Sequence, residues 1–239
     1  MNSLDRNVGA YTGGNVYDFD NEVMLTWYPR RILDLCAGAK SLLELGLGHG
    51  HTTSLMAQTF RRHLVLDGSP AVIANFRSTH PDCTAEIREV YFEDFETDER
   101  FDVIVMGFIL EHVDDPVLVM RRYRRFLAPG GRIFVAVPNA ESLNRRVGHA
   151  AGLLPDMQAL SPNDHLLGHQ RYYTVASFSD DIACAGYDVV RMEGIYLKPL
   201  MTTQMLALGL SEALIRGFCE VGIRYPELSC GMLAEIAPR

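Results

Sequence analysis

The sequence contains little that would serve a membrane span, a disulfide framework or a zinc site. Its longest apolar stretch is interrupted by Glu111 and His112 and stays shorter than the about 20 residues that a membrane-spanning helix needs. The five cysteines include no Cys-x-x-Cys pair, which predicts reduced thiols. The amino terminus lacks the charged and then apolar pattern of a signal peptide. We therefore expect a cytoplasmic protein without a membrane partner.

Positive charge is also scarce in this chain. Its 22 lysines and arginines face 30 aspartates and glutamates, so that the net charge is −8 at pH 7. A protein that follows the phosphates of nucleic acid normally carries a basic face. One dense basic cluster is present, Arg121, Arg122, Arg124 and Arg125, and it is typical of the solvated face of a helix. We therefore expect no nucleic-acid partner.

What the sequence does contain, from Ser41 onward, is an alternation of short apolar strands and helices. Strands are predicted at 42–45, 63–66, 85–90, 101–106, 132–137, 187–195 and 232–237, and helices at 117–127 and 174–185. Little polar and apolar alternation within the strands is typical of a parallel sheet covered on both faces. We therefore predict one α/β domain over residues 1–239.

Three segments lie outside this alternation. Residues 1–38 are predicted to form an amino-terminal lid with a helix that Pro29 breaks or kinks and that stops near Gly38. Residues 139–173 and 198–229 are insertions, and such insertions usually form lids, binding loops or interfaces. The second insertion is rich in apolar residues, which also predicts a homodimer surface.

A glycine-rich turn follows the first strand, with Gly46, Gly48 and Gly50 at alternate positions. Glycines allow the backbone to approach a ligand closely, and the helix that follows offers free N–H groups. Asp67 ends the second strand, where a carboxylate can accept hydrogen bonds from both hydroxyls of a ribose; it could equally cap the next helix. A dinucleotide site is disfavoured, because His51 stands where that fingerprint needs glycine or alanine.

At this point the sequence resembles the class I S-adenosylmethionine-dependent methyltransferases of the small-molecule type. The resemblance rests on Glu44-x-Gly46-x-Gly48-x-Gly50, Asp67-Gly68-Ser69, Phe101-Asp102-Val103-Ile104-Val105, Leu110-Glu111-His112-Val113 and Leu127-Ala128-Pro129-Gly130-Gly131. These motifs occur in the order and spacing of the family over about residues 40–140. The resemblance implies a Rossmann-like, doubly wound sheet of seven strands, mostly parallel, with the last strand antiparallel.

The resemblance also implies that S-adenosyl-L-methionine is the cofactor and which residues bind it. The methionine end would lie against Gly46, Gly48 and Gly50, with Glu44 beside them, and Asp67 would hold the ribose. Further contacts would come from Gly68 and Phe92 near the adenine, from Phe108 and His112 near the sulfonium, and from an aromatic face of Tyr11 or Tyr17. Many family members bind the adenine through an aspartate where this chain has Tyr91 and Phe92, so Glu93 or Asp94 could serve instead.

The candidate catalytic residues are Asn139, His169 and Tyr172. Asn139 follows the fifth strand at the edge where open α/β sheets hold ligands, and the other two lie in the first insertion. Each could also have a structural role, Asn139 as a turn former and His169 as a hydrogen-bonded core residue. His165 and His169 have the spacing of a metal-binding pair, but Pro162 and Gly168 argue against the continuous helix that such a pair needs, so we expect no metal.

These residues predict an enzyme that methylates oxygen or nitrogen of a small metabolite, such as a sugar or a natural-product intermediate. A second reading is a lyase or cyclase in which the amine of the cofactor attacks its own aminopropyl carbon and expels methylthioadenosine. A third reading is a cofactor-binding protein without catalysis.

Overall fold

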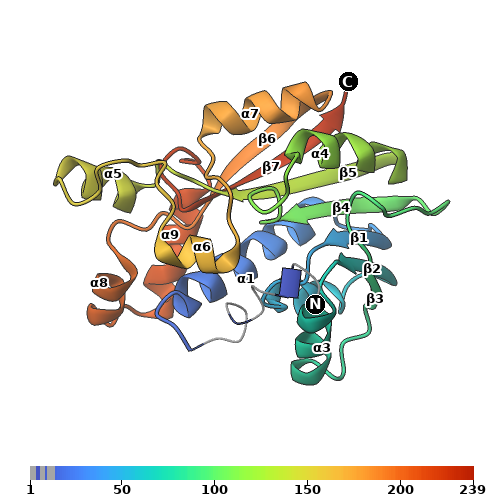
Figure 1. The fold of residues 1–239 in the computed structure, drawn as a ribbon, viewed down its shortest axis with the longest axis horizontal. Coiled ribbons are helices and arrows are strands. Elements are labelled where there is room, and N and C mark those ends of the chain that lie inside the picture. The colour runs from blue at the N-terminus through green and yellow to red at the C-terminus, as the bar shows by residue number, and fades with distance from the viewer. Residues whose placement is uncertain (1–3, 6–8, 10–13) are drawn as a thin grey trace.

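The apolar segments of the sequence form the strands of one central sheet. The computed structural model describes residues 4–5, 9 and 14–239. Its strands are β1 (Ser41–Leu45), β2 (Arg62–Asp67), β3 (Glu86–Glu89), β4 (Phe101–Gly107), β5 (Leu127–Pro138), β6 (Tyr187–Ile195) and β7 (Gly231–Pro238). They lie in the order β3-β2-β1-β4-β5-β7-β6, and β7 runs antiparallel to β5 and β6 (Figure 1). The predicted Rossmann-like sheet with an antiparallel last strand is confirmed.

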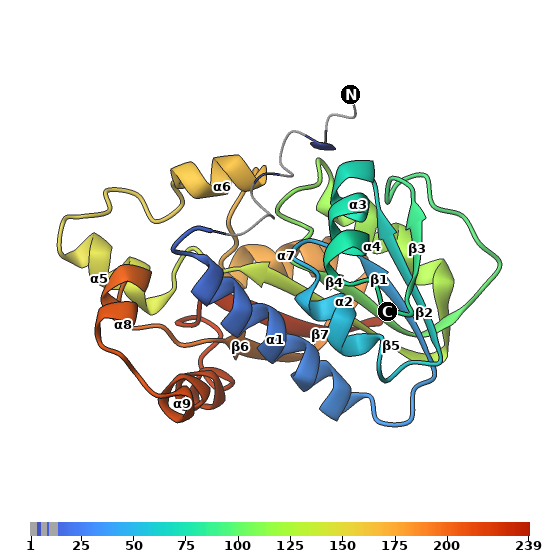
Figure 2. The same cartoon turned by 90° about the horizontal axis from the view of Figure 1, so that it is seen from below.

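Helices cover both faces of this sheet (Figures 1 and 2). They are α1 (Asp18–Leu35), α2 (His51–Met56), α3 (Pro70–Thr79), α4 (Pro116–Tyr123), α5 (Leu143–Ala150), α6 (Pro162–Leu167), α7 (Val175–Cys184), α8 (Thr202–Ala207) and α9 (Glu212–Gly222). Neighbouring strand residues point to opposite faces, so Leu42 packs with Ile32 of α1, whereas Leu43 belongs to the cluster of Val119 and Phe178 on α4 and α7. Two buried faces explain why the central strand β4 is an almost continuous apolar run.

The prediction was that Pro29 breaks or kinks the first helix, and the break is wrong, because α1 continues to Leu35 with Pro29 buried inside it. Proline has no N–H to donate to the carbonyl of residue 25, and this would normally leave that oxygen unpaired. The Thr52 hydroxyl on α2 donates to the Leu25 carbonyl at 3.3 Å, and Tyr28 Oη lies 2.9 Å from Thr52 Oγ1. A partner from another helix therefore replaces the missing hydrogen bond.

The strand after α4 is longer than its sequence pattern indicates. A turn was predicted at Pro129–Gly131 with the strand from Arg132, but β5 begins at Leu127. Leu127 pairs with Phe101, and the register with β4 shifts before Val103 pairs with Arg132. The predicted turn at Pro129–Gly131 is thus an irregularity inside β5.

The inserted segments lie beyond the carboxyl ends of the central strands. Residues 139–173 carry α5 and α6, and residues 198–229 carry α8 and α9, and all four lie on the same side of the molecule in Figure 2. None of the helices in the described part of the chain is both long and apolar enough to cross a membrane. This arrangement gathers the loops after β1, β2, β4 and β5 under the insertions.

Candidate active site

A cavity of about 1140 Å³ lies at the carboxyl ends of β1, β2, β4 and β5. Its lining includes all thirteen site residues that the sequence predicted within the described part of the chain, namely Tyr17, Glu44, Gly46, Gly48, Gly50, Asp67, Gly68, Phe92, Phe108, His112, Asn139, His169 and Tyr172. Tyr11, the alternative to Tyr17, lies outside the described residues. Pockets for one small ligand usually measure about 300–1,000 Å³, and this cavity is slightly larger.

The glycine turn brings main chain to the wall of the cavity. Gly46, Gly48 and Gly50 have φ angles of 85°, 48° and 81°, a region that residues with a side chain rarely adopt. Packing also requires glycine, since a Cβ at Gly50 would lie 2.7 Å from the Phe76 ring. The turn is therefore both left-handed and closely packed.

Glu44 shapes this turn through its side chain. Its carboxylate accepts from the Thr53 hydroxyl at 2.9 Å and lies 2.7 Å from His63 Nε2. These contacts join β1 to α2 and β2, and both carboxylate oxygens have protein partners. The contacts favour a structural role, whereas a direct contact of Glu44 with the cofactor stays a prediction.

Asp67 lines the cavity next to the glycine turn. Its two carboxylate oxygens accept from the N–H of Leu47 at 3.0 Å and of Ser69 at 2.8 Å. Burial raises the pKa of Asp67, and the two main-chain hydrogen bonds oppose that rise. The alternative role as a helix cap is wrong, because Ser69 is the N-cap residue of α3 and its hydroxyl accepts from Val72 N–H. Asp67 thus faces the cavity with its position set by main chain.

The segment after β3 forms the wall next to Asp67. Tyr91, Phe92 and Glu93 line the cavity, whereas Asp94 is not among its lining residues. The Tyr123 hydroxyl donates to the Phe92 carbonyl at 3.1 Å and so fixes this segment. Of the two acidic alternatives for the adenine contact, the geometry therefore retains Glu93.

Arg171, in the first insertion, holds the loop after β4 in place through hydrogen bonds. The Arg171 guanidinium donates to the carbonyls of Leu110 at 2.7 Å and Val113 at 2.5 Å. Phe108, at the start of this loop, has a φ of 54°, a strained value of the kind that concentrates at functional sites. Residues 108–113 are thereby held under the segment that carries His169.

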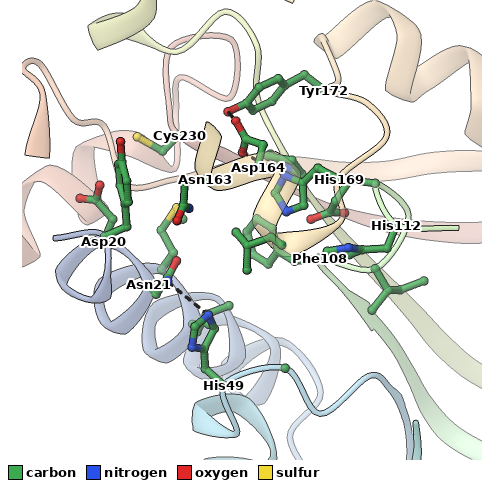
Figure 3. A pocket seen from close by; sticks show the side chains of 18 of the residues that line it. Asp20, Asn21, His49, Phe108, His112, Asn163, Asp164, His169, Tyr172 and Cys230 are labelled. Atoms are coloured by element: carbon green, nitrogen blue, oxygen red, sulfur yellow. Dashed lines mark hydrogen bonds and ion pairs between the residues drawn. The ribbon is translucent and has the colours of Figure 1, made fainter. Parts of the chain in front are cut away.

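His169 and Asp164 form a pair at the centre of the cavity (Figure 3). Nδ1 of His169 lies 3.1 Å from Oδ1 of Asp164, in an ion-pair contact without the alignment of a hydrogen bond. Burial alone would lower the pKa of His169, but the carboxylates of Asp164 and Glu111 outweigh burial and raise it. Burial alone would raise the pKa of Asp164, but the nearby His169 ring and the N–H and hydroxyl of Ser161, which donate to Asp164, hold that pKa far below the usual range.

Glu111 and His112 lie beside this pair. Burial raises the pKa of Glu111 to about 7 and lowers that of His112 to about 3. Both carboxylate oxygens of Glu111 are buried, and no described residue forms a hydrogen bond with either. Ligand atoms of Glu111, His112 and His169 all lie within 4.8 Å of one another, so these three groups could hold a metal ion. His165 does not belong to this group, and the continuous helix that a His165 and His169 pair would need is absent, because α6 ends at Leu167 before His169.

The polar atoms of Asn139 and Tyr172 are engaged within the protein. Asn139 Nδ2 donates to the carbonyls of Pro226 at 3.1 Å and Ser229 at 2.9 Å, and its Oδ1 accepts from Glu141 N–H. The Tyr172 hydroxyl donates to Asp164 at 2.9 Å. These contacts favour a turn-forming role for Asn139 and a role for Tyr172 in positioning Asp164, and a direct catalytic contact of either stays a prediction.

Comparison with known proteins identifies the family. The model of a family described as "Methyltransferase domain" matches residues 21–192, well over half of the chain. The chain belongs to this methyltransferase family. The class I, S-adenosylmethionine-dependent resemblance found in the sequence is thereby confirmed, and S-adenosyl-L-methionine is the cofactor of the family.

Individual relatives of this methyltransferase-family chain are distant. A probable S-adenosylmethionine-dependent methyltransferase of Mycolicibacterium smegmatis is 27% identical over 168 residues, covering 70% of this chain and 59% of the relative. The ubiquinone biosynthesis O-methyltransferase of Pseudomonas fluorescens is 29% identical over 123 residues, covering 50% of this chain and 52% of the relative. The chain thus spans little more than half the length of these two relatives.

Solved structures show the same fold. The N-methyltransferase NodS of Bradyrhizobium japonicum, in complex with S-adenosylhomocysteine, has a TM-score of 0.62 at 14% identity, covering 100% of this chain and 99% of NodS. A possible histamine N-methyltransferase of Thermotoga maritima has a TM-score of 0.64 at 16% identity and covers 93% of both chains.

The residues of this methyltransferase-family chain fit the cofactor. Gly46, Gly48 and Gly50 offer main chain without a side chain at those positions, and among the described residues Asp67 presents a carboxylate that accepts from main-chain N–H groups alone. Sequence reasoning missed two residues at the other end of the cavity, Asp164 and Glu111, as site residues. Asp164 lies in the first insertion and Glu111 in one of the family motifs, but nothing in the sequence indicated that both flank His169.

Proposed function

We propose that this chain transfers the methyl group of S-adenosylmethionine to an oxygen or nitrogen atom of a small metabolite, such as a sugar or a natural-product intermediate. The observation that carries the proposal is the composition of one cavity. The glycine turn and Asp67 lie at one end of this cavity. His169, which is paired with the buried Asp164, lies at the other end. A cofactor and an acceptor could therefore meet between the two ends.

The end of the cavity at the glycine turn and Asp67 offers groups that suit each part of S-adenosylmethionine. The N–H groups of the turn and of the start of α2 suit the carboxylate of the methionine part, and Asp67 suits the ribose hydroxyls. Phe92 and Glu93 border the adenine. When bound, the cofactor supplies a methyl group on a positively charged sulfur, which a lone pair of the acceptor can displace.

The acceptor end supplies a base. His169 Nε2 takes the proton that the acceptor hydroxyl or amine loses, and Asp164 stabilises the charged ring. Tyr172 keeps Asp164 oriented through its hydrogen bond of 2.9 Å. The named activities of relatives and neighbours, O-methylation and N-methylation, support both kinds of acceptor atom.

Product analysis tests this proposal. Purified protein is incubated with S-adenosylmethionine, alone and with a panel of hydroxyl- and amine-bearing metabolites, and the adenosyl products are separated by chromatography. Acceptor-dependent S-adenosylhomocysteine supports methyl transfer. Methylthioadenosine formed without an acceptor would instead support the lyase or cyclase, and tight binding without either product would support a non-catalytic protein.

A pair of histidine variants locates the base. His169→Ala is expected to lower turnover by about 10²–10⁴-fold, the usual contribution of a general base. His165→Ala is the matched control, because His165 is on α6 but is not among the residues that line the cavity. If His169→Ala turns over as fast as the control His165→Ala, His169 is not the base.

A further inference from the structure

Three segments distant in the sequence meet in a buried polar cluster at the cavity wall. Asp20 comes from the first turn of α1, Lys198 follows β6, and Thr202 begins α8. Lys198 Nζ donates to Asp20 Oδ2 at 2.5 Å and to Thr202 Oγ1 at 3.1 Å, and the Thr202 hydroxyl donates to the same Asp20 oxygen at 2.5 Å. All three residues line the cavity.

The second carboxylate oxygen of Asp20 has no hydrogen-bond partner among the described residues. Asp20 and Lys198 are each only 6% exposed, and Asp20 Oδ1 is itself buried. A buried carboxylate oxygen without a donor is costly, and native proteins seldom contain one. Lys198 has three N–H donors, and the contacts above use two of them. Within the described part of the chain, the cluster therefore has one acceptor and one donor that a ligand could satisfy.

The place of the cluster separates it from the proposed reaction centre. In Figure 3, Asp20 and His112 lie at opposite ends of the view, with Asp164 and His169 between them. A molecule that reached both Asp20 and His169 would have one group at the base and another at the cluster. The cluster is thus suited to a part of the acceptor that is not itself methylated.

We propose that Asp20 and Lys198 form a recognition subsite for two adjacent hydroxyl groups of the acceptor. This inference rests on the proposed function and names the class of its substrate. One hydroxyl donates to Asp20 Oδ1, and its neighbour accepts from Lys198 Nζ. The two protein charges balance each other, so a neutral diol adds no uncompensated charge to the cluster, whereas a carboxylate, phosphate or ammonium group would. Adjacent hydroxyls occur on aromatic rings and on sugar-like saturated rings.

Binding of matched small probes tests the subsite without turnover. Dissociation constants are measured by ligand-observed NMR for protein loaded with S-adenosylhomocysteine. One probe pair is catechol and phenol, and the other is trans-cyclohexane-1,2-diol and cyclohexanol. Wild type is expected to prefer a diol over its mono-hydroxyl partner by about 10- to 100-fold, as for a hydrogen bond to a charged group. The pair that shows the preference distinguishes an aromatic from a sugar-like acceptor.

Variants then assign the preference to the cluster. Asp20→Asn is expected to reduce it to less than about threefold while the affinity for S-adenosylhomocysteine stays unchanged. The double variant Asp20→Asn/Lys198→Met should do the same, and it leaves no unpaired buried charge if the single variant folds poorly. Asp34→Asn is the matched control, because Asp34 is an exposed aspartate of the same helix.

The possible results separate this inference from the proposed function. The subsite is overturned if wild type prefers neither diol, or if the folded double variant retains the preference of wild type. S-adenosylhomocysteine production is measured independently, so its absence counts against methyl transfer alone. Rapid methylation of acceptors without adjacent hydroxyls, unaffected by Asp20→Asn, counts against the subsite alone.

Discussion

Asp67 and Asp164 are both buried aspartates at the cavity, yet their pKa values move in opposite directions. Among the described residues, Asp67 accepts from main-chain N–H groups alone, and burial raises its pKa. Burial also acts to raise the pKa of Asp164, but the contact with His169 and the two hydrogen bonds from Ser161 together hold it far below the usual range. Several favourable partners acting together therefore outweigh the effect of burial at Asp164. This difference suits Asp67 to neutral ribose hydroxyls and Asp164 to a charged imidazole.

The role of Asp67 gives the first prediction. Asp67→Ala should weaken S-adenosylmethionine binding by about 1.5–3 kcal/mol, as for loss of a charged hydrogen-bond acceptor, and should leave the fold intact. Calorimetric titration measures the change, and Asp34→Ala serves as an exposed control. Unchanged affinity of Asp67→Ala would show that the ribose lies elsewhere.

The His169 and Asp164 pair gives the second prediction. The folded-state pKa of His169 lies above its usual 6.5, so the ring contributes stability below pH 6.5 that is lost as the pH rises through the raised value. Asp164→Asn removes a carboxylate that favours the charged ring, so the midpoint of the His169 NMR titration should fall. Asp156→Asn, an exposed position in the same insertion, should not move it. A midpoint that is the same in Asp164→Asn and wild type would contradict the pairing.

At the scale of elements, α1 and α2 depend on each other. Pro29 deprives the Leu25 carbonyl of its helical donor, and the Thr52 hydroxyl of α2 takes that place. The same hydroxyl meets Tyr28, whose hydroxyl is buried. Since α2 starts at the glycine turn, the contact also links the amino-terminal helix to the cofactor end of the cavity.

This dependence predicts the effect of Thr52→Val. The substitution keeps the shape of the side chain but leaves the Leu25 carbonyl and the Tyr28 hydroxyl without their partner. The free energy of unfolding should fall by about 1–3 kcal/mol, the usual cost of an unsatisfied buried polar group. Urea unfolding measures it, with the exposed Thr59→Val as control. A change below about 0.5 kcal/mol would mean that water or a small shift replaces the bond.

At the scale of the whole molecule, α8, α9 and the turn between them present apolar side chains on the surface. Leu206, Leu208, Leu214 and Val221 are 46%, 57%, 55% and 50% exposed. The homodimer expected through residues 198–229 stays a prediction, and these side chains are where it can be tested. Leu214→Glu should convert a dimer to a monomer in light-scattering measurements, and Leu153→Glu, in the other insertion, should not. A wild-type monomer at high concentration would refute the prediction.

The sheet could be predicted from the sequence because each strand carries its own signal. Strands buried on both faces are continuous apolar runs, and the bounds of β4, Phe101–Gly107, agree to within one residue with the predicted strand at 101–106. That Pro29 does not break α1 has the opposite cause. Part of the cost of a proline inside a helix is the unpaired carbonyl, and here the donor that pairs it is 27 residues away in the sequence.

The cofactor end was predictable for a similar reason, since Gly46, Gly48, Gly50 and Asp67 follow directly from the ends of neighbouring strands. The acceptor end was decided by tertiary structure. Glu111 and His169 lie 58 positions apart, as the residue numbers show, and Asp20 and Lys198 178 apart. No local pattern encodes such pairs, because it is the folding of two insertions over one sheet edge that brings them together. Burial there also sets which carboxyl is charged, and burial depends on the whole fold.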